Sequence, residues 1–186
     1  MNTNEEFDII IQKCTDIFSK KAIDYGTAWR ILRTASLTDQ IYIKAQRIRS
    51  IQEKGVHKID EDATPEFIGI INYAVMALIQ LEIGVADTME ELTPAEEAIA
   101  LFGKHINKAK ALMLDKNHDY GEAWRRMRVS SITDIILMKL LRIKQIEDND
   151  GKTIISEGLE ANYHDIINYA VFALIKITLY KIFHTL

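Results

Sequence analysis

The chain has 186 residues, of which 48% are hydrophobic and 27% are charged, so it can bury a core and does not have the composition of a disordered chain. Its formal net charge of −4 and its sequence pI of about 5.8 give no overall positive field for nucleic acid. The single cysteine, Cys14, excludes an internal disulfide and a cysteine-based zinc site. We expect a cytoplasmic protein with no nucleic-acid partner and no membrane partner, because the acidic start lacks the basic and apolar regions of a signal peptide.

Helices are predicted nearly throughout, because prolines occur only at 65 and 94 and glycines fall mainly between long periodic segments. In chain order, the pattern predicts helices over residues 5–23, 37–54 and 65–83, followed by a polar linker over residues 87–93. The sequence Thr93-Pro94-Ala95-Glu96 predicts a capping box that opens the next helix. Two further helices are expected, over residues 132–147 and from residue 157 to the C-terminus.

An internal duplication organises these elements. The segment DYGTAWRILRTASLTD, residues 24–39, returns as DYGEAWRRMRVSSITD at residues 119–134. The last helices of the two halves, FIGIINYAVMALIQL and YHDIINYAVFALIKI, are apolar nearly all round and are therefore expected to be central and buried. We predict an all-α fold, a helical bundle of two tandem three-helix repeats with pseudo-twofold symmetry and the two last helices packed together. The first repeat covers residues 1–86 and the second covers residues 93–186, in one compact unit.

The two halves have diverged unevenly. Between residues 4–23 and 99–118, identity is confined to Phe7, Ile11, Lys13, Lys21 and their counterparts, whereas roughly half of residues 24–51 match residues 119–146. A core tolerates the exchange of apolar residues when volume and pattern are kept. The more similar segment is therefore under a constraint beyond packing.

Several of the repeated residues have ordinary structural interpretations. The paired glycines of the two DYG motifs are expected to end helices in a left-handed conformation. Ser36 and Ser131 are expected to cap the helices that follow, with Asp39 and Asp134 at the third helical position. These interpretations need no ligand.

Asp24 and Asp119 are less easily explained. Each is expected in the last turn of a helix, where an acid opposes the helix dipole and needs a partner cation. That cation is either a metal ion or an arginine. In the first half, Arg30 and Arg33 are the candidate arginines.

Lys44 and Lys139 fall within the apolar stripes of their helices, so each is expected to face an anion. The anion is either an internal carboxylate or the phosphate of a ligand. In the second case the candidate phosphate-binding residues are Arg30, Arg33, Lys44 and Arg47 in the first half, and Arg125, Arg128, Lys139 and Arg142 in the second.

Acids in the last helix of the second half suggest a metal site. Magnesium prefers carboxylate oxygens, and Glu157, Glu160 and Asp165 are the predicted catalytic residues and metal ligands, joined by Asp119 or Glu122 from the DYGEAW turn. The first half keeps Glu61 but has Gly69 where the second half has Asp165. A complete site is therefore expected only in the second half.

The motifs DYGxAWR, SxTD and KxxRI, with a late glutamate and DIINYA, resemble the nucleotide modification associated domain, a small helical family of bacteria and phages. The resemblance occurs in tandem and covers nearly the whole chain. More distantly, acids on bundle helices beside basic residues resemble the all-α nucleotide pyrophosphohydrolases of the MazG and dimeric dUTPase kind. These enzymes use magnesium to split nucleoside triphosphates into monophosphate and pyrophosphate. Glu157 and Glu160 match their ExxE pattern, but Asp165 is expected on the same helix instead of the next one.

These resemblances imply a nucleotide-processing protein, in which carboxylates hold magnesium and the basic residues steady a polyphosphate. A second hypothesis is a non-catalytic module that binds a nucleotide or a partner protein. A third is a structural bundle whose repeated charges pair internally. The sequence is compatible with a homo-oligomer under all three hypotheses.

Overall fold

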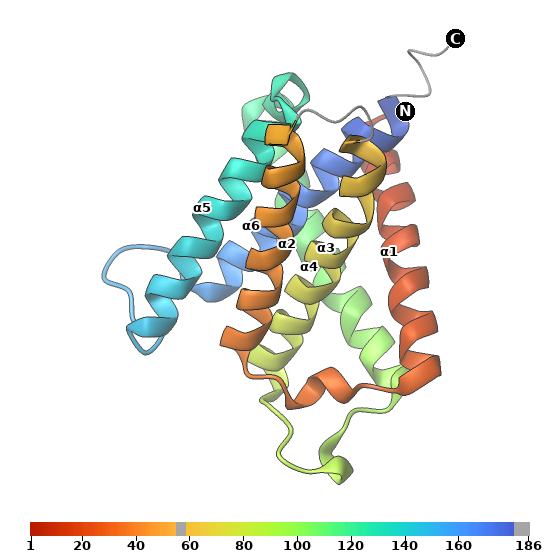
Figure 1. The fold of residues 1–186 in the computed structure, drawn as a ribbon, viewed down its shortest axis with the longest axis vertical. Coiled ribbons are helices and arrows are strands. Elements are labelled where there is room, and N and C mark those ends of the chain that lie inside the picture. The colour runs from red at the N-terminus through yellow and green to blue at the C-terminus, as the bar shows by residue number, and fades with distance from the viewer. Residues whose placement is uncertain (55–58, 181–186) are drawn as a thin grey trace.

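The computed structural model describes the backbone of residues 1–54 and 59–180 and the side chains of residues 1–54 and 63–180. Over these ranges the chain is helical and contains no strand, which confirms the all-α class (Figure 1). The first half contains α1 (Thr3–Tyr25), α2 (Thr34–Lys54) and α3 (Ile59–Ile83). The second half contains α4 (Ala95–Tyr120), α5 (Val129–Asp148) and α6 (Leu159–Leu174).

Short turns join these helices at equivalent places in the two halves. A 3-10 turn follows α1 at Ala28–Ile31, and another follows α4 at Ala123–Arg126. The linker between the halves contains a third 3-10 turn, Met89–Glu91. After α6 the helix continues as a π-helical turn, Ile175–Leu179.

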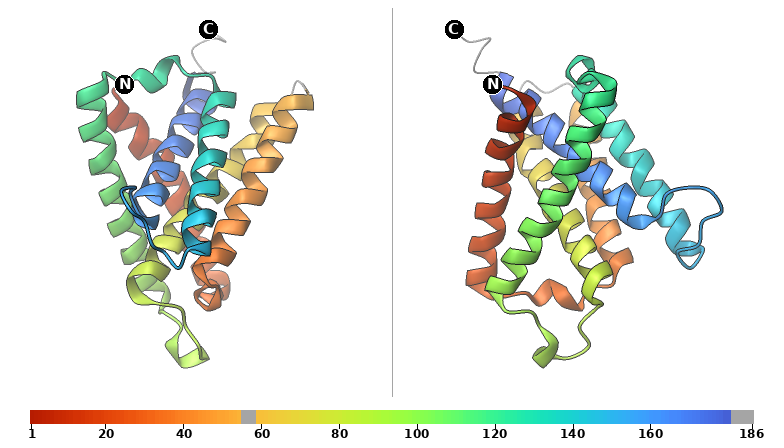
Figure 2. Two further views of the ribbon diagram at one scale, coloured as in Figure 1. Left: turned by 90° about the vertical axis from the view of Figure 1, so that its left-hand side faces the viewer. Right: turned by 180° about the vertical axis from the view of Figure 1, so that it is seen from behind.

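Each helix of the first half packs against its counterpart in the second, α1 against α4, α2 against α5 and α3 against α6 (Figures 1 and 2). Two equivalent ion pairs join α2 and α5. Lys144 Nζ lies 2.6 Å from Asp39 Oδ1, and Arg49 Nη1 lies 3.6 Å from Asp134 Oδ1. Arg49 and Lys144 are equivalent, as are Asp39 and Asp134, so the two pairs are the exchange of contacts that a twofold relation produces.

Hydrogen bonds at the same interface are reciprocal too. Thr38 Oγ1 donates to Glu147 Oε1 at 2.8 Å, and Gln52 Nε2 donates to Thr133 Oγ1 at 3.0 Å. Thr38 also lies 2.6 Å from the hydroxyl of Tyr163 in α6. The predicted pseudo-twofold arrangement of two tandem three-helix repeats is confirmed.

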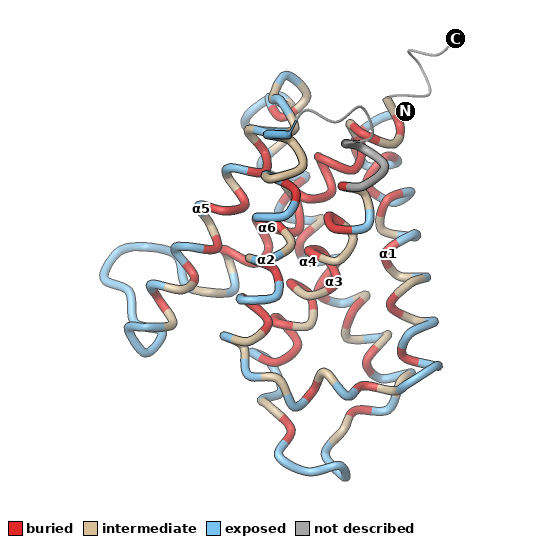
Figure 3. Tube along the Cα trace, in the orientation of Figure 1, coloured by how far each residue is buried: buried red, intermediate tan, exposed pale blue. Residues whose placement is uncertain are grey.

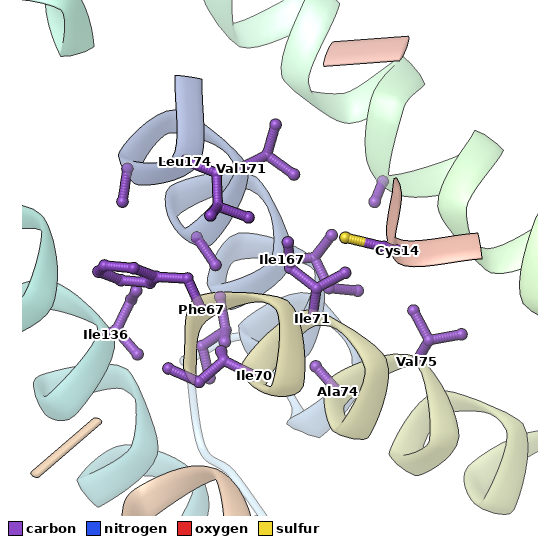
Figure 4. Packing of buried hydrophobic residues seen from close by; sticks show 14 of the residues in the cluster. Cys14, Phe67, Ile70, Ile71, Ala74, Val75, Ile136, Ile167, Val171 and Leu174 are labelled. Atoms are coloured by element: carbon purple, nitrogen blue, oxygen red, sulfur yellow. The ribbon is translucent and has the colours of Figure 1, made fainter. Parts of the chain in front are cut away.

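The core is centred on α3 and α6, as their apolar sequences predict. Figure 3 shows buried residues concentrated on these helices, and Figure 4 shows Ile71 of α3 beside Ile167 of α6. Cys14 of α1 reaches the same cluster, and burial raises the pKa of its thiol to about 12. Cys14 therefore behaves as a small apolar side chain.

Part of α3 is unusually long and apolar. Among the described helices, the stretch Ala63–Ile83 is the one long and apolar enough to cross a membrane. Most of that stretch is buried inside the bundle. Core helices of soluble proteins pass the same test of length and composition.

Several predicted helix starts are wrong. The second helices begin at Thr34 and Val129, three residues early, so Ser36 and Ser131 lie inside them and cap nothing. Before α5 the extended backbone of Arg128 starts the helix, and its carbonyl accepts from Ile132 N–H at 3.1 Å. Asp39 and Asp134 are therefore not capping acids but partners in the ion pairs between α2 and α5.

Two other helices also start differently. α4 follows Pro94, its N-cap residue, without a side-chain capping bond. Thr93, the predicted capping residue, instead accepts a hydrogen bond from Arg30. α3 begins at Ile59 and contains Pro65, which was predicted to be its first residue. A proline lacks the N–H that an interior position donates, so it marks a helix start only by tendency.

The core packing predicts a large cost for truncating α3. Ile71→Ala should lower the free energy of unfolding by about 2–5 kcal/mol, because a fully buried isoleucine loses both its burial and its packing partners. Ile43→Ala on the outer side of α2 is the control, since Ile43 is 57% exposed, and should cost less than about 1 kcal/mol. Urea denaturation followed by circular dichroism measures both. Equal costs would contradict the central role of α3.

A buried histidine predicts a pH dependence of stability. Burial lowers the pKa of His105 in α4 below its ordinary 6.5, and Glu82, whose Oε2 lies 2.7 Å from His105 Nε2, offsets this only in part. The unfolded chain takes up a proton below pH 6.5 more readily than the folded chain, so the free energy of unfolding should fall as the pH drops below 6.5.

The substitution His105→Gln should weaken this fall. The matched control is His118→Gln, which removes a histidine with a 90% exposed side chain. Urea denaturation of the three proteins at a series of pH values between about 7.5 and 5 makes the comparison. A fall in stability that persists unchanged in His105→Gln would assign it to other groups.

Candidate functional site

Two cavities lie at equivalent places in the two repeats. The first cavity, of about 540 Å³, and the second cavity, of about 520 Å³, are each lined by the first and third helices of a repeat, the turn between its first two helices, and a lysine from its second helix. Both volumes fall in the range of small-molecule sites, about 300–1,000 Å³. The equivalent lining residues are Lys21, Tyr25, Trp29, Lys44, Asn72 and Tyr73 in the first cavity, and Lys116, Tyr120, Trp124, Lys139, Asn168 and Tyr169 in the second.

The DYG motif shapes the rim of each cavity. α1 ends at Tyr25 and α4 ends at Tyr120, and the following glycines, Gly26 and Gly121, have φ values of 69° and 60°. Only Gly121 is left-handed as predicted, since Gly26 has a ψ of −149°. A positive φ is easy for glycine, and it turns the chain so that the next residues lead the tryptophan back to the cavity.

The second cavity contains a three-membered ionic cluster. Lys139 Nζ lies 2.5 Å from Asp165 Oδ2, and Lys116 Nζ lies 2.5 Å from Asp165 Oδ1. The side chains of Lys139 and Asp165 are only 12% and 11% exposed. Burial alone would raise the pKa of Asp165, but the hydrogen bonds from the two ammonium groups hold it below its ordinary value.

The first cavity has the same two lysines but a different carboxylate. Gly69 occupies the place of Asp165, and a Cβ on Gly69 would lie 2.7 Å from Cε of Lys44, so the lysine side chain lies directly over this glycine. Lys44 Nζ reaches Oε2 of Glu66 at 3.2 Å, and Arg47 binds the other oxygen of Glu66 at 3.0 Å. Among the residues that the structure describes, none forms an ion pair with Lys21.

Lys44 and Lys139, the lysines within the apolar stripes of α2 and α5, are both paired. The expectation that Lys44 and Lys139 each face an anion is confirmed. In both halves that anion is an internal carboxylate. The two carboxylates do not occupy equivalent positions. Glu66 is equivalent to Asn162, and Asp165 is equivalent to Gly69, so the carboxylate of the first repeat lies three residues earlier on its third helix.

The arginines of the two AWR motifs serve as tethers. Arg30 is 3% exposed and donates to Thr93 Oγ1 at 2.9 Å and to the Gly84 carbonyl at 2.6 Å, which fastens the linker to the turn after α1. Arg125 binds Glu6 Oε2 at 2.8 Å and the hydroxyl of Tyr180, at the opposite end of the bundle (Figure 2). Neither arginine lines a cavity.

The remaining predicted phosphate ligands are dispersed. Arg33, Arg128 and Arg142 are exposed, and Arg47 is bound to Glu66. Of the predicted basic set, the structure places Lys44 in the first cavity and Lys139 in the second.

The predicted metal ligands do not gather around one point. Asp165 is held by two lysines, while Glu160 pairs with Lys108 and lines a separate hollow beside Glu82. Glu157 is exposed at the edge of the second cavity. Asp119 is exposed and lies 3.3 Å from His118.

Within the described part of the chain, no three His, Cys, Asp or Glu side chains are close enough to hold a metal ion. As they are placed, these residues do not fit a magnesium site, and magnesium binding stays a prediction. The side chain of Glu61 lies outside the described residues. Asp24 is exposed and has no ion pair among the described residues, so its expected partner cation is not found.

Sequence reasoning missed several cavity residues. Lys21 and Lys116 form one of the few identities retained between α1 and α4, and this identity is the sequence signal that points to them. Asn72 and Asn168 donate equivalent hydrogen bonds to the carbonyls of Cys14 and Ala109, at 3.3 and 3.0 Å. Their buried Oδ1 atoms have no partner within the described structure.

The fold and the cavities define an all-helical protein made of two copies of one domain, each with an aromatic cavity that contains two lysines. The family model for the nucleotide modification associated domain 1 matches residues 21–81 and 116–177. The chain therefore belongs to this family and carries its domain twice, and the matched segments contain nearly all of the cavity residues. No curated protein and no solved structure showed a significant match to the chain. The distant likeness to the MazG and dUTPase-type pyrophosphohydrolases gains no support from these comparisons.

The ionic cluster of the second cavity predicts a specific stability effect. Asp165→Asn should lower the free energy of unfolding by about 2–3 kcal/mol, somewhat less than loss of one partner of a fully buried pair, because the half-exposed Lys116 can turn to water. The control is Glu160→Gln, which breaks an exposed pair with Lys108 and should cost about 1 kcal/mol or less. Thermal and urea denaturation measure both costs, and an Asp165→Asn effect no larger than that of the control would contradict the cluster's importance.

Proposed function

We propose that the first cavity binds a phosphorylated small molecule that carries an aromatic ring, such as a nucleotide. The observation that carries this proposal is the ammonium group of Lys21, which forms no ion pair with a described residue, at an aromatic cavity that already contains Lys44. Among the described lining residues, two ammonium groups share this cavity with one carboxylate, that of Glu66. A phosphate is the anion that lysine side chains commonly bind in such a setting.

The aromatic lining supports a ring-shaped ligand. Tyr25, Trp29 and Tyr73 line the first cavity, and Tyr25 is 62% exposed, so its ring face is available for contact. Planar bases stack on such rings with about 1–3 kcal/mol each. The Nζ atom of Lys44 lies 5.8 Å from the ring centre of Tyr73, which puts cation and aromatic wall within the span of one nucleotide.

An unpartnered amide oxygen supports a ligand with a hydrogen-bond donor. The side-chain nitrogen of Asn72 is held by the Cys14 carbonyl, which leaves Oδ1 as the group that faces away from that bond. Oδ1 is buried and has no partner among the described residues. A buried acceptor left unpaired costs about 1–3 kcal/mol, so an amino or hydroxyl group of the ligand would stabilise the complex there.

Binding is proposed in preference to hydrolysis because of where the acids lie. The pyrophosphohydrolase hypothesis required Glu157, Glu160 and Asp165 to act together, and they are engaged with lysines or exposed at separate places. The first cavity is lined by aromatic rings and two lysines, and its described lining residues include one acid, Glu66. Hydrolysis of a nucleoside triphosphate stays an untested prediction.

Ligand-dependent stabilisation tests this proposal. Thermal melts with nucleoside tri-, di- and monophosphates, nucleosides and pyrophosphate, with and without magnesium, should show a rise in Tm for at least one phosphorylated compound. Lys21→Met should weaken that compound's binding by about tenfold or more, equivalent to about 1.4 kcal/mol. Trp29→Ala should weaken the nucleotide more than it weakens pyrophosphate, because only the nucleotide has a ring to stack.

The matched control is Lys20→Met, which removes the same charge from the neighbouring exposed residue outside the cavity. This variant should bind as tightly as the wild type. Equal losses in Lys20→Met and Lys21→Met would indicate a general charge effect, and a wild type stabilised by no compound of the panel would overturn the proposal.

A further inference from the structure

The two cavities differ in what lies between their equivalent lysines. In the second cavity the carboxylate of Asp165 lies between Lys116 and Lys139 and accepts from both at 2.5 Å. In the first cavity position 69 is a glycine, and no side chain that the structure describes places such a carboxylate between Lys21 and Lys44. The second cavity therefore shows how this pair of lysines converges on an anion.

We infer that Asp165 is a built-in substitute for the ligand's phosphate, so that only the first cavity of each chain takes a phosphorylated ligand. This inference rests on the proposed function of the first cavity. The residue at position 69, or at its counterpart 165, then decides which repeat binds. A glycine there leaves the lysines able to bind an external anion. An aspartate there pairs with both lysines itself.

The balance of charge supports this division. The lining of the second cavity contains Lys116 and Lys139 together with Asp165 and Glu157, so its formal charges cancel. A phosphate entering there would have to displace a carboxylate held by hydrogen bonds from the largely buried Lys139 and the half-exposed Lys116, and it would be repelled by Glu157 as well. Among the described lining residues of the first cavity there are two lysines and one acid, Glu66, while the side chain of Glu61, the counterpart of Glu157, lies outside the described residues.

The position of the internal carboxylate explains how the first cavity keeps its charge. Glu66 lies one helical turn before Gly69, and it binds Lys44 together with Arg47 from α2. From there it engages Lys44, and no described residue forms an ion pair with Lys21. At the equivalent place in the second repeat, Asn162 donates to the Gly158 carbonyl at 2.9 Å and carries no charge.

The tryptophan is also more fully covered in the second cavity than in the first. Trp124 in the second cavity is buried and stacks on Phe172, with ring centres 4.4 Å apart and planes 3° apart. In the first cavity Met76 stands at the position of Phe172, and Trp29 is only partly buried. The second repeat thus provides internal partners for its tryptophan face and for both of its lysines, whereas in the first repeat Trp29 is only partly buried and Lys21 has no ion pair with a described residue.

Exchanging the two acid positions between the repeats tests the inference. The variant Glu66→Asn with Gly69→Asp gives the first repeat the residues of the second, and the variant Asn162→Glu with Asp165→Gly does the reverse. Each double variant keeps the number of carboxylates and the net charge. An aspartate at position 69 meets only the flexible end of the Lys44 side chain, which can move to pair with it.

Isothermal titration with inorganic pyrophosphate gives the number of sites per chain. The wild type should bind one equivalent, the first double variant none, and the second double variant two, with affinities at the two sites within about tenfold of each other. Lys21→Met and Lys116→Met, placed in the second double variant, should each remove one of its two sites. Circular dichroism of every variant verifies that the helices are retained.

Asp165→Asn is measured beside these variants and should also gain a second site, so a double variant that fails to fold does not decide the result. Failure of the wild type to bind pyrophosphate, with no nucleotide of the panel raising its Tm either, would overturn the proposed function itself. If a nucleotide raises the Tm and pyrophosphate does not bind, the same titrations are made with that nucleotide. One equivalent in the wild type, with no second site in Asp165→Asn or in a folded Asn162→Glu, Asp165→Gly variant, would overturn this inference alone. Two equivalents in the wild type would overturn it as well.

Discussion

The packing of α3 against α6 is the constraint on which the rest of the structure depends. Both helices are apolar on nearly every side, so neither is stable in water unless other helices cover it. Placing the two together about a twofold relation leaves outer faces that α2 and α5 cover, while α1 and α4 close the remaining side. The turn between the first two helices of each repeat then lies against the third helix of the same repeat, and a cavity forms there twice.

Because the third helices are buried, any charge near them needs a partner. This explains why the lysines of α2 and α5 keep a carboxylate in both halves, although the carboxylate has moved by one helical turn. Glu66 and Asp165 both solve the problem of a lysine beside an apolar helix. They differ in how many of the cavity's lysines they engage, since Glu66 pairs with Lys44 alone and Asp165 pairs with both Lys116 and Lys139.

Much of this fold could be predicted from one sequence, because the duplication supplied an internal comparison. The helices, the symmetry and the need of Lys44 and Lys139 for an anion all follow from periodicity and repetition. The tethers formed by Arg30 and Arg125 and the roles of Asp39 and Asp134 could not be predicted, since long side chains reach segments that are distant in sequence. Periodicity assigns a residue to a face of its helix, but not to the helix that this face meets. For the same reason, the sequence did not show that Glu160 and Asp165 of α6 pair with lysines of α4 and α5.

On the proposed function, the two repeats would divide stability and binding between them. In the second repeat, Asp165 pairs with both lysines and Phe172 stacks on Trp124. In the first repeat, Glu66 pairs with Lys44, the exposed Lys21 has no ion pair with a described residue, and Met76 stands at the position of Phe172. The buried amide oxygens of Asn72 and Asn168 both lack a partner within the described structure, so they do not distinguish the repeats. Because the pseudo-twofold core joins the two halves, the stability of the whole bundle absorbs a loss of ion pairing in one repeat, which gives a physical reason for a chain to keep both copies and to let them differ at position 69.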